Sequence, residues 1–273
     1  MNKKIITVII PTYNRKIRKE IVKRFFFFKK FIKIIIVDDG SSVRIKNYNK
    51  KILDTFSQIS FIELNENRGQ SYACNQGLKK TDTKYVWFFD DDDTVNNKSI
   101  KNIISTLILK NAGGYLLPAC KMYNNIKIKT IYPEIRPHNF NDLRNNGQLV
   151  NTSCAIFKTS IIKKINGWDE NFYGGTDTDL FLRYSMHSNF LFLKTFPIKI
   201  NIAVNNRLTN KILRQQKAKI FFLLKHWKVL TIKRKFYYIF SLLFFFPLFY
   251  TLKDSLMLLL AKIKNNVKLN VQE

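Results

Sequence analysis

Short apolar runs alternate with amphipathic segments over the N-terminal third of the chain. The apolar runs are rich in β-branched and aromatic residues, and they cover residues 5–10, 33–37, 60–64 and 85–89. The segments between them carry apolar residues at helical spacing, and they cover residues 16–30, 44–56 and 69–78. Buried strands alternating with helices predict an α/β fold, with a mostly parallel sheet flanked by helices.

Polar turns follow three of the predicted strands. They read PTYN at residues 11–14, DDGSS at residues 38–42 and DDDD at residues 90–93. In parallel α/β sheets ligands bind at the carboxyl ends of the strands. We therefore expect one crevice to collect all three turns.

The charge distribution also indicates a localised site. The 273 residues include 47 Lys and Arg against 19 Asp and Glu, and the net charge of +28 favours an anionic partner. Ten acids nevertheless fall in three short segments, at residues 38–39, 90–93 and 169–179. The three cysteines show no CxxC spacing, so we expect reduced thiols in a cytosolic protein and no zinc site. The first apolar run is too short for a signal peptide, so we expect a first strand there.

The four consecutive aspartates suit a hard cation. Asp90 and Asp92, two residues apart, can converge on Mg²⁺ or Mn²⁺, which prefer oxygen ligands. The alternative is a solvated turn or a helix cap, and we expect Asp93 to cap the next segment. Asp90-x-Asp92-x-Thr94 also fits a phosphate-ester hydrolase with Asp90 as nucleophile, but that interpretation leaves the other acidic segments unexplained.

Five motifs in order resemble the inverting family 2 glycosyltransferases with the GT-A fold. They are PTYN (11–14), VDDGSS (37–42), NENRGQSYACNQG (65–77), FFDDDD (88–93) and GWDENFYGGTDTDLFLR (167–183). The resemblance covers roughly residues 5–205. It implies a GT-A Rossmann-like catalytic domain at residues 1–206.

The resemblance implies a nucleotide-diphosphate-sugar donor held with Mn²⁺ or Mg²⁺. Asp90 and Asp92 would bind the metal. Asp39 would accept a hydrogen bond from N3–H of the base, which favours UDP or dTDP, whereas Asp38 would shape the turn. The full donor-binding set implied by the resemblance is Pro11, Thr12, Tyr13, Asp39, Asn67, Arg68, Gly69, Asp90 and Asp91.

The last motif implies the acceptor side. Asp177 falls where the family places the carboxylate that deprotonates the acceptor hydroxyl, which would be on a saccharide or a lipid-linked glycan. Trp168, Gly175 and Asp179 would lie on the acceptor side. We expect a helix over residues 180–187, which leaves Asp179 as either a capping acid or a catalytic one.

Two departures from the family pattern concern charge. Thr176 stands where many relatives have Glu, and Cys74 stands where many have Arg. The second departure leaves the neutralisation of the diphosphate without an assigned residue.

The C-terminal residues 207–273 differ from the rest. They hold fourteen Lys or Arg and only two acids, and residues 236–252 carry no charge but include Pro247. We expect a basic helical tail that binds an anionic membrane surface, with residues 236–252 lying in the interface, spanning the bilayer or packing on protein. Because the basic residues gather here rather than in a nucleic-acid module, we expect no nucleic acid partner.

The sequence therefore predicts a metal-dependent inverting glycosyltransferase. It would work at the inner face of the cytoplasmic membrane, in the synthesis of a surface polysaccharide or lipopolysaccharide. A phosphate-ester hydrolase and a catalytically inactive nucleotide-sugar-binding module are the alternatives.

Overall fold

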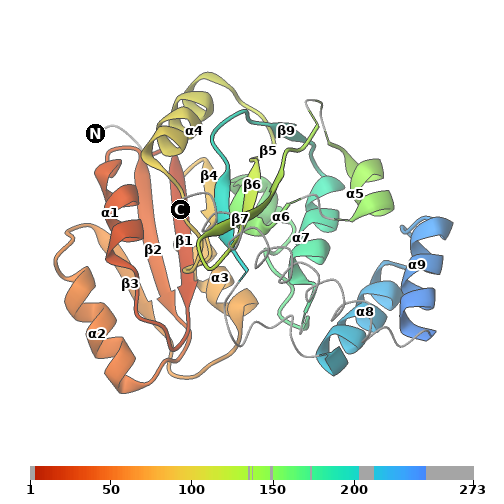
Figure 1. The fold of residues 1–273 in the computed structure, drawn as a ribbon, viewed down its shortest axis with the longest axis horizontal. Helices are drawn as coiled ribbons and strands as arrows, with labels where there is room; N and C mark the ends of the chain where they lie inside the picture. Colours follow the sequence, from red (N-terminus) through yellow and green to blue (C-terminus); the bar gives the residue numbers. More distant parts are fainter. Residues whose placement is uncertain are drawn as a thin grey trace, which may run out of the picture.

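The computed structural model describes residues 4–134, 136, 138–147, 150–172, 174–202 and 212–243. Figure 1 shows a large central sheet with helices on both faces and a smaller sheet beside it. Of the uncharged stretch at residues 236–252, only residues 236–243 are described. The remainder of the tail lies outside the described residues.

The central sheet has seven strands in the order β3-β2-β1-β4-β8-β5-β9. Strands β3, β2, β1 and β4 run parallel, whereas β8 runs antiparallel to both β4 and β5. The predicted mostly parallel sheet is therefore confirmed. The strands are β1 (Ile6–Thr12), β2 (Ile32–Asp38), β3 (Ile59–Glu63), β4 (Tyr85–Phe88), β5 (Gly114–Leu116), β8 (Ala155–Lys158) and β9 (Phe190–Phe192).

The smaller sheet has the order β10-β6-β7. Its strands are β6 (Ala119–Tyr123), β7 (Ile126–Ile131) and β10 (Ile198–Asn201). A β-bridge joins Thr94 to Lys199, so this sheet reaches the segment that follows β4. The contact places β10 against the run of aspartates.

Helices cover both faces of the central sheet. The helices of the described residues are α1 (Lys19–Phe27), α2 (Val43–Leu53), α3 (Gln70–Lys79), α4 (Asn97–Leu109), α5 (Phe140–Asn146), α6 (Thr159–Lys164), α7 (Thr176–Ser185), α8 (Ile212–His226) and α9 (Ile232–Leu243), with a 3₁₀ turn η1 (Thr152–Cys154). The helix predicted over residues 180–187 begins earlier, at Thr176, because Gly175 adopts the left-handed conformation (φ 66°) and serves as the N-cap. Asp177 therefore lies in the first turn of α7.

Strand β1 extends past the proline that we expected to end it. Pro11 pairs with Val37 of β2, whereas the pairing with β4 ends at Ile9 and Phe88. The Ile9 carbonyl accepts a hydrogen bond from the Phe89 amide of the neighbouring segment. Pro11 lies two residues further on and faces the same side, beyond the last pair with β4, so its missing N–H breaks no pairing with that strand. The extension carries Thr12 into the turn region.

The core beneath the site is aromatic. Phe25, Trp87 and Phe89 make edge-to-face contacts with ring centroids 5.1 to 5.6 Å apart. The indole Nε1 of Trp87 donates to the carbonyl of Ser153 at 2.8 Å, which ties η1 to β4. This packing holds the end of β4, and hence the aspartates, on a rigid base.

Helices α8 and α9 pack against each other at one end of the molecule, and α9 also contacts α5 (Figure 1). Phe172, which precedes α7, contacts the rings of Phe221 and Phe222 on α8. Within the described part of the chain, no helix is both long enough and apolar enough to cross a bilayer.

Candidate active site

The three polar turns meet at the carboxyl ends of β1, β2 and β4, as predicted. The Asp39 amide donates to the Thr12 carbonyl at 2.9 Å, and the Asn14 amide donates to Ser41 Oγ at 2.8 Å. Thr12 Oγ1 in turn donates to Asp91 Oδ2 at 2.7 Å. The turns therefore form one hydrogen-bonded unit.

Three of the four aspartates converge. Carboxylate oxygens of Asp90, Asp92 and Asp93 all lie within 4.8 Å of one another. Asp93 is 1% exposed and accepts from the Asn201 amide of β10 at 3.1 Å. The expectation that Asp93 caps the next segment is wrong, because Asn96 caps α4 by accepting from the Ser99 amide. Asp93 instead joins the carboxylate cluster.

Asp90 lies at the centre of this negative charge. Burial, and then the charges of Asp93 and Asp177, raise its pKa well above the usual value. Its Oδ1 accepts from Gln70 Nε2 at 2.8 Å, and its amide donates to Ser153 Oγ at 3.0 Å. Its side chain is thus held from α3 and its backbone from η1.

These oxygens fit a divalent cation. Three convergent carboxylates form a hard oxygen donor set, and a cation would offset the repulsion that adds to burial in raising the pKa of Asp90. Asp90 and Asp92 were predicted as ligands, and Asp93 is the third carboxylate of the group.

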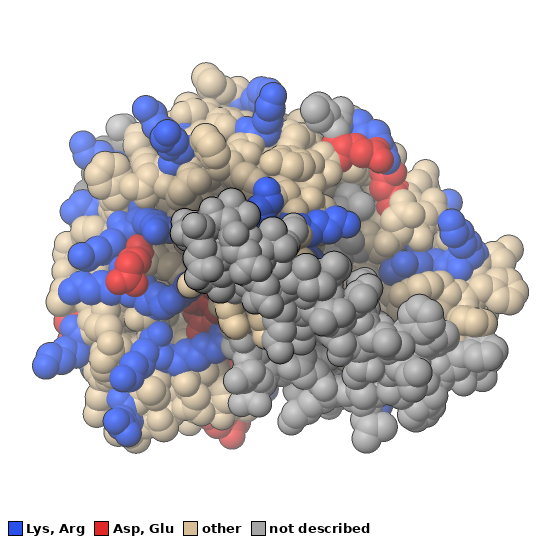
Figure 2. Space-filling model, in the orientation of Figure 1, with Lys and Arg blue, Asp and Glu red and all other residues tan. Residues whose placement is uncertain are grey.

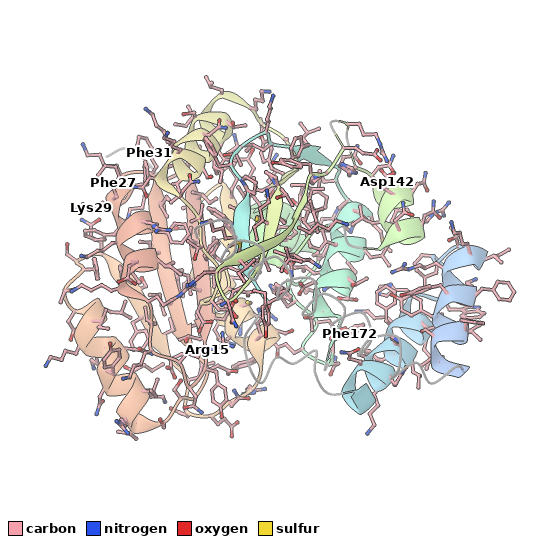
Figure 3. The ribbon with its side chains drawn as sticks, in the orientation of Figure 1. Arg15, Phe27, Lys29, Phe31, Asp142 and Phe172 are labelled. Carbon is pink, nitrogen blue, oxygen red and sulfur yellow. The ribbon has the colours of Figure 1, made fainter. Side chains whose placement is uncertain are left out.

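Two arginines that the sequence interpretation did not include contact the aspartates. Arg15 Nη1 lies 2.6 Å from Asp91 Oδ1 and 3.2 Å from Asp92 Oδ2, and Figure 3 shows it below the end of β1. Arg18 donates to the backbone carbonyls of Asp91 and Asp93, so it shapes the turn. The position of Arg15 directly after PTYN was the available signal for this contact.

Asp39 organises the loop before α3. It is 3% exposed, and its carboxylate accepts from the amides of Arg68 (2.9 Å) and Gly69 (2.8 Å) and from Asn67 Nδ2 (3.1 Å). A carboxylate has about four acceptor positions, so about one remains for a ligand. Burial raises the pKa of Asp39, and these backbone hydrogen bonds oppose the rise. Neighbouring Asp38 accepts from the Ser41 amide at 2.8 Å, which is the turn role expected for it.

Three residues expected around the nucleotide are exposed, namely Tyr13, Asn67 and Arg68. Tyr13 is 46% exposed, so its ring is open to solvent. The Arg68 guanidinium lies 3.8 Å from the centroid of the Tyr72 ring, one helical turn away. Tyr13 and Arg68 border the turn unit on its solvent side.

Asp177 is brought to the aspartate cluster from another part of the chain. It is partly exposed in the first turn of α7, and its charge raises the pKa values of Asp90 and Cys74. For Cys74 burial is the larger cause. The structure therefore unites the two segments to which the sequence assigned metal and base.

Trp168 is buried in the core, whereas the sequence predicted it on the acceptor side. It is 2% exposed and packs edge-to-face on Phe88, with centroids 5.3 Å apart. Asn75 clamps its backbone, donating to the Trp168 carbonyl at 2.9 Å and accepting from its amide at 2.9 Å. Trp168 thus packs between α3 and β4.

Asp179 is also buried, at 0% exposure. It contacts two cations and a histidine: Arg183 Nη2 at 2.6 Å, Lys225 Nζ at 2.7 Å and His226 Nε2 at 2.8 Å. Burial raises its pKa, but these partners outweigh burial and hold the pKa well below the usual value. Asp179 therefore links α7 to α8 in a buried ion cluster rather than facing an exposed acceptor site.

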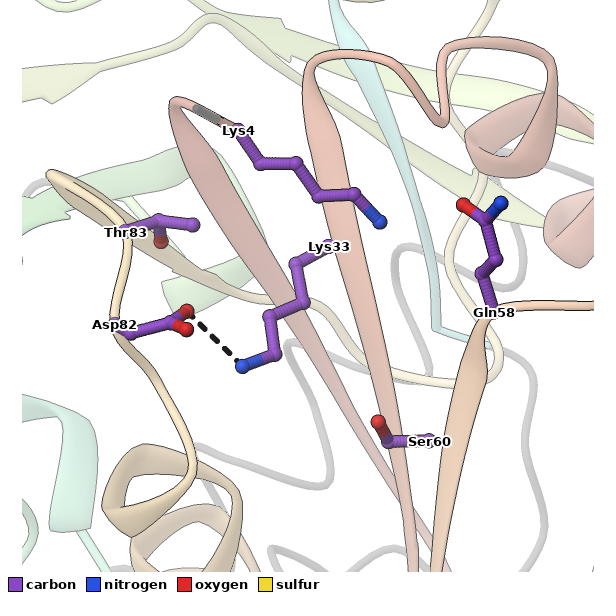
Figure 4. Close-up of a pocket in the computed structure, with 6 residues that line it drawn as sticks. All are labelled: Lys4, Lys33, Gln58, Ser60, Asp82 and Thr83. Atoms are coloured by element: carbon purple, nitrogen blue, oxygen red, sulfur yellow. Dashed lines mark hydrogen bonds and ion pairs between the residues drawn. The ribbon is translucent and has the colours of Figure 1, made fainter. Parts of the chain in front are cut away.

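A separate hollow of about 300 Å³ lies at the amino ends of the strands, opposite the aspartate cluster (Figure 4). Lys33 and Asp82 form an ion pair of 3.0 Å across it. Its distance from the carboxyl ends of the strands removes it from the aspartate site. The remaining lining residues are Lys4, Gln58, Ser60 and Thr83.

Curated relatives include a teichoic acid polymerase and a glucosyltransferase. A teichoic acid poly(glycerol phosphate) polymerase of Staphylococcus epidermidis is 27% identical over 69% of this chain and 27% of its own length. A GalNAc(5)-diNAcBac-PP-undecaprenol beta-1,3-glucosyltransferase of Campylobacter jejuni is 25% identical over 71% of this chain and 63% of its own length. The chain thus spans less than two thirds of either relative.

Solved structures share the fold. Staphylococcus aureus TarS in complex with UDP-GlcNAc superposes with a TM-score of 0.63 at 16% identity, covering 80% of this chain and 66% of that chain. The mannosyltransferase PcManGT of Pyrobaculum calidifontis, in complex with GDP-Man and Mn²⁺, gives 0.62 at 17% identity, covering 88% and 70%. The fold is therefore that of GT-A glycosyltransferases.

The family model described as glycosyl transferase family 2 matches residues 7–165, more than half of the chain. This match covers the strand ends, the turn unit and the aspartate cluster. The chain therefore belongs to glycosyltransferase family 2.

Proposed function

We propose that the protein transfers a sugar from a nucleotide-diphosphate donor to a saccharide or lipid-linked acceptor, with inversion and with a divalent cation. The convergence of Asp90, Asp92 and Asp93 beside Asp177 carries this proposal. Family membership supports transfer over the phosphate-ester hydrolase, and it also accounts for the DDGSS turn that the hydrolase leaves unexplained.

The donor would lie across the turn unit. Tyr13 offers an exposed ring to the base, and Asp39 retains about one acceptor position for N3–H of uracil or thymine. Asp90 and Asp91 would contact ribose or metal. The complex of TarS with UDP-GlcNAc supports a uridine donor. Because PcManGT is in complex with GDP-Man, GDP-sugars are included among the donors to be tested.

Asp90, Asp92 and Asp93 would hold Mn²⁺ or Mg²⁺. When bound, such a cation supplies Lewis-acid stabilisation of the departing diphosphate. Arg15 contacts Asp91 and Asp92 and would place positive charge beside the diphosphate. It would thereby replace the arginine of the third family motif, where this chain has Cys74.

Asp177 would take the proton from the acceptor hydroxyl. As the hydroxyl oxygen forms its bond to the anomeric carbon, the bond from that carbon to the diphosphate oxygen breaks, and the configuration inverts. Asp177 lies in the first turn of α7, where the helix N-terminus carries partial positive charge. A base must be ionised to accept this proton.

The acceptor and location follow from the relatives and the charge. The C. jejuni relative is named for an undecaprenol-linked acceptor, which supports a lipid-linked acceptor here. The net charge of +28 supports peripheral binding at an anionic membrane surface, on the cytoplasmic side where nucleotide sugars are made. Surface polysaccharide or lipopolysaccharide synthesis is the setting that we propose.

A thermal-shift panel tests the donor class. UDP-, dTDP- and GDP-sugars are each added with and without Mn²⁺, and the proposal expects a rise in Tm for a uridine or thymidine donor that requires the metal. Hydrolysis of each donor is followed in parallel. A donor that binds without any release of nucleotide, at any acceptor supplied, would favour the inactive binding module.

A further inference from the structure

Helices α8 and α9 present apolar side chains to solvent in two helical stripes. On α8 and just after it, Ile220, Leu224 and Trp227 follow i, i+4, i+7 spacing and are 46%, 70% and 46% exposed. On α9, Ile232 and Phe236 follow i, i+4 spacing and are 71% and 67% exposed. We call these five residues the docking face. Single exposed apolar residues are ordinary, but aligned stripes on neighbouring helices indicate an interaction surface.

The charge around the docking face has one sign. Residues 212–243 contain no Asp or Glu, and their eight basic residues are Arg214, Lys217, Lys219, Lys225, Lys228, Lys233, Arg234 and Lys235. Lys235 Nζ lies 4.5 Å from the centroid of the Trp227 ring, so charge and apolar surface are interleaved. Figure 2 shows Lys and Arg side chains in blue at the right-hand end of the molecule, which α8 and α9 form in Figure 1.

The positive charge distinguishes between two possible partners of the docking face, a second copy of the chain and a bilayer. A second copy would bring a second set of basic side chains against the first, with no acid on either pair of helices to offset the repulsion. An anionic bilayer offers both the complementary charge and an apolar interior for the stripes. Amphipathic helices with basic flanks and Trp, Phe and Leu on the apolar side bind membranes in this manner.

We propose that the docking face binds the surface of a bilayer that contains anionic lipids. This deepens the proposed function, on which its purpose rests, by naming the side chains that would bring the enzyme to a lipid-linked acceptor. Ile220, Leu224, Trp227, Ile232 and Phe236 enter the interface, while Lys228 and Lys233 contact the headgroups.

The docking face is connected to the candidate base. Lys225 and His226, at the end of α8, both contact Asp179 of α7, and Asp177 lies two residues earlier in the same helix. Docking of α8 and α9 would therefore fix the orientation of α7 relative to the membrane. The acceptor hydroxyl and its base would be held near the same surface.

Vesicle flotation with the full chain tests the proposal. The probes are vesicles of phosphatidylcholine alone and vesicles in which about a third of the lipid is phosphatidylglycerol. The wild type should float only with the second kind. The triple variant Leu224→Ser, Ile232→Ser, Phe236→Ser should lose at least tenfold in apparent affinity. Lys228→Gln with Lys233→Gln should weaken binding and reduce its salt dependence.

A matched control uses exposed apolar residues elsewhere. Ile108 and Leu109 of α4 are 54% and 82% exposed and lie on another part of the molecule, so Ile108→Ser with Leu109→Ser should leave flotation unchanged (Figure 1). Circular dichroism and Tm establish that each variant is folded. A wild type that does not float, or a folded triple variant that floats like the wild type, would overturn the proposal. A lipid-free dimer that the triple variant dissociates would also overturn it, since the face would then bind a second copy.

The same samples separate this proposal from the proposed function. Nucleotide-sugar binding is measured by thermal shift on the wild type and on the triple variant. Loss of flotation with donor binding intact supports the docking face independently of catalysis. Flotation without any donor binding would refute the proposed function, but the proposal that the docking face binds a bilayer would stand.

Discussion

Arg15 Nη1 lies 2.6 Å from Asp91 Oδ1 and 3.2 Å from Asp92 Oδ2, so one guanidinium joins two members of the aspartate run. The Arg15 side chain is still 39% exposed, which leaves part of its donor set available. This contact places a cation beside the cluster in a chain where Cys74 replaces the arginine of the third family motif.

The first prediction follows from Arg15. If its guanidinium binds the donor diphosphate, Arg15→Ala should lower the affinity for UDP about tenfold, because a charge-assisted hydrogen bond contributes on the order of 1.5 kcal/mol. The affinity for uridine, which lacks the diphosphate, should not change. Isothermal titration calorimetry measures both, with Arg44→Ala, an exposed arginine of α2, as the control. Equal losses for UDP and uridine would assign Arg15 to the architecture of the turn alone.

The second prediction concerns the base. Asp177→Asn should reduce transfer at least 100-fold, since general base catalysis contributes roughly 10² to 10⁴ in rate. Donor binding, followed by thermal shift with Mn²⁺, should survive because the carboxylate cluster is intact. Asp177→Asn with full transferase activity would remove Asp177 from the mechanism.

The third prediction concerns the buried ion cluster of Asp179. Asp179→Ala leaves Lys225, His226 and Arg183 without their shared anion, so the free energy of unfolding should fall by about 3 kcal/mol. Asp82→Ala is the control: Asp82 is 76% exposed in its pair with Lys33, and its loss should cost less than about 1 kcal/mol. Urea titration measures both variants, and similar losses would contradict a structural role for the cluster.

The same cluster predicts a pH dependence. The folded pKa of Asp179 is depressed below the usual 3.8, so its contribution to stability is present above about pH 4 and is lost as the pH falls further. The wild type should therefore lose stability on acidification more steeply than Asp179→Ala. Parallel curves for the two proteins between pH 5 and 3, read by Tm, would contradict the assignment.

The fifth prediction compares two glycines with positive φ. Gly40 (φ 73°) follows Asp39, and a Cβ there would overlap the backbone of Glu66 and Asn67. Gly69 (φ 93°) has open space at the same position. Gly40→Ala should displace the loop that Asp39 organises and weaken donor binding more than tenfold, whereas Gly69→Ala adds only backbone strain of about 1 to 3 kcal/mol. Donor titration of both variants checks this, and equal donor affinities would show that the loop tolerates the side chain.

Much of the fold was predictable because it depends on local patterns. Apolar runs locate β1, β2, β3 and β4, and the rule for parallel sheets correctly brings the polar turns together at their carboxyl ends. Helix and strand boundaries differ by a few residues, as at Thr12, because pairing with a neighbour decides where a strand ends. Strands β5 and β8 were not predicted, since they are short and pair with distant segments.

The site was predictable where chemistry is concentrated and not where contacts come from distant segments. Four adjacent aspartates are recognisable in the sequence, but one partner of Asp93 is the amide of Asn201, 108 residues away. Trp168 and Asp179 were expected on the acceptor side because of their neighbours in the motif. Their burial depends on Asn75 and on α8, which no local pattern reveals.

Calorimetric titration of UDP into the protein, with Mn²⁺ and with excess chelator, tests the central claim most directly. The account predicts that UDP binds with Mn²⁺ present, that chelation abolishes the binding, and that Asp92→Asn weakens it at least tenfold while the Tm without ligand is maintained. UDP binding of equal strength with and without the metal, unchanged in Asp92→Asn, would contradict a donor site built on the carboxylate cluster.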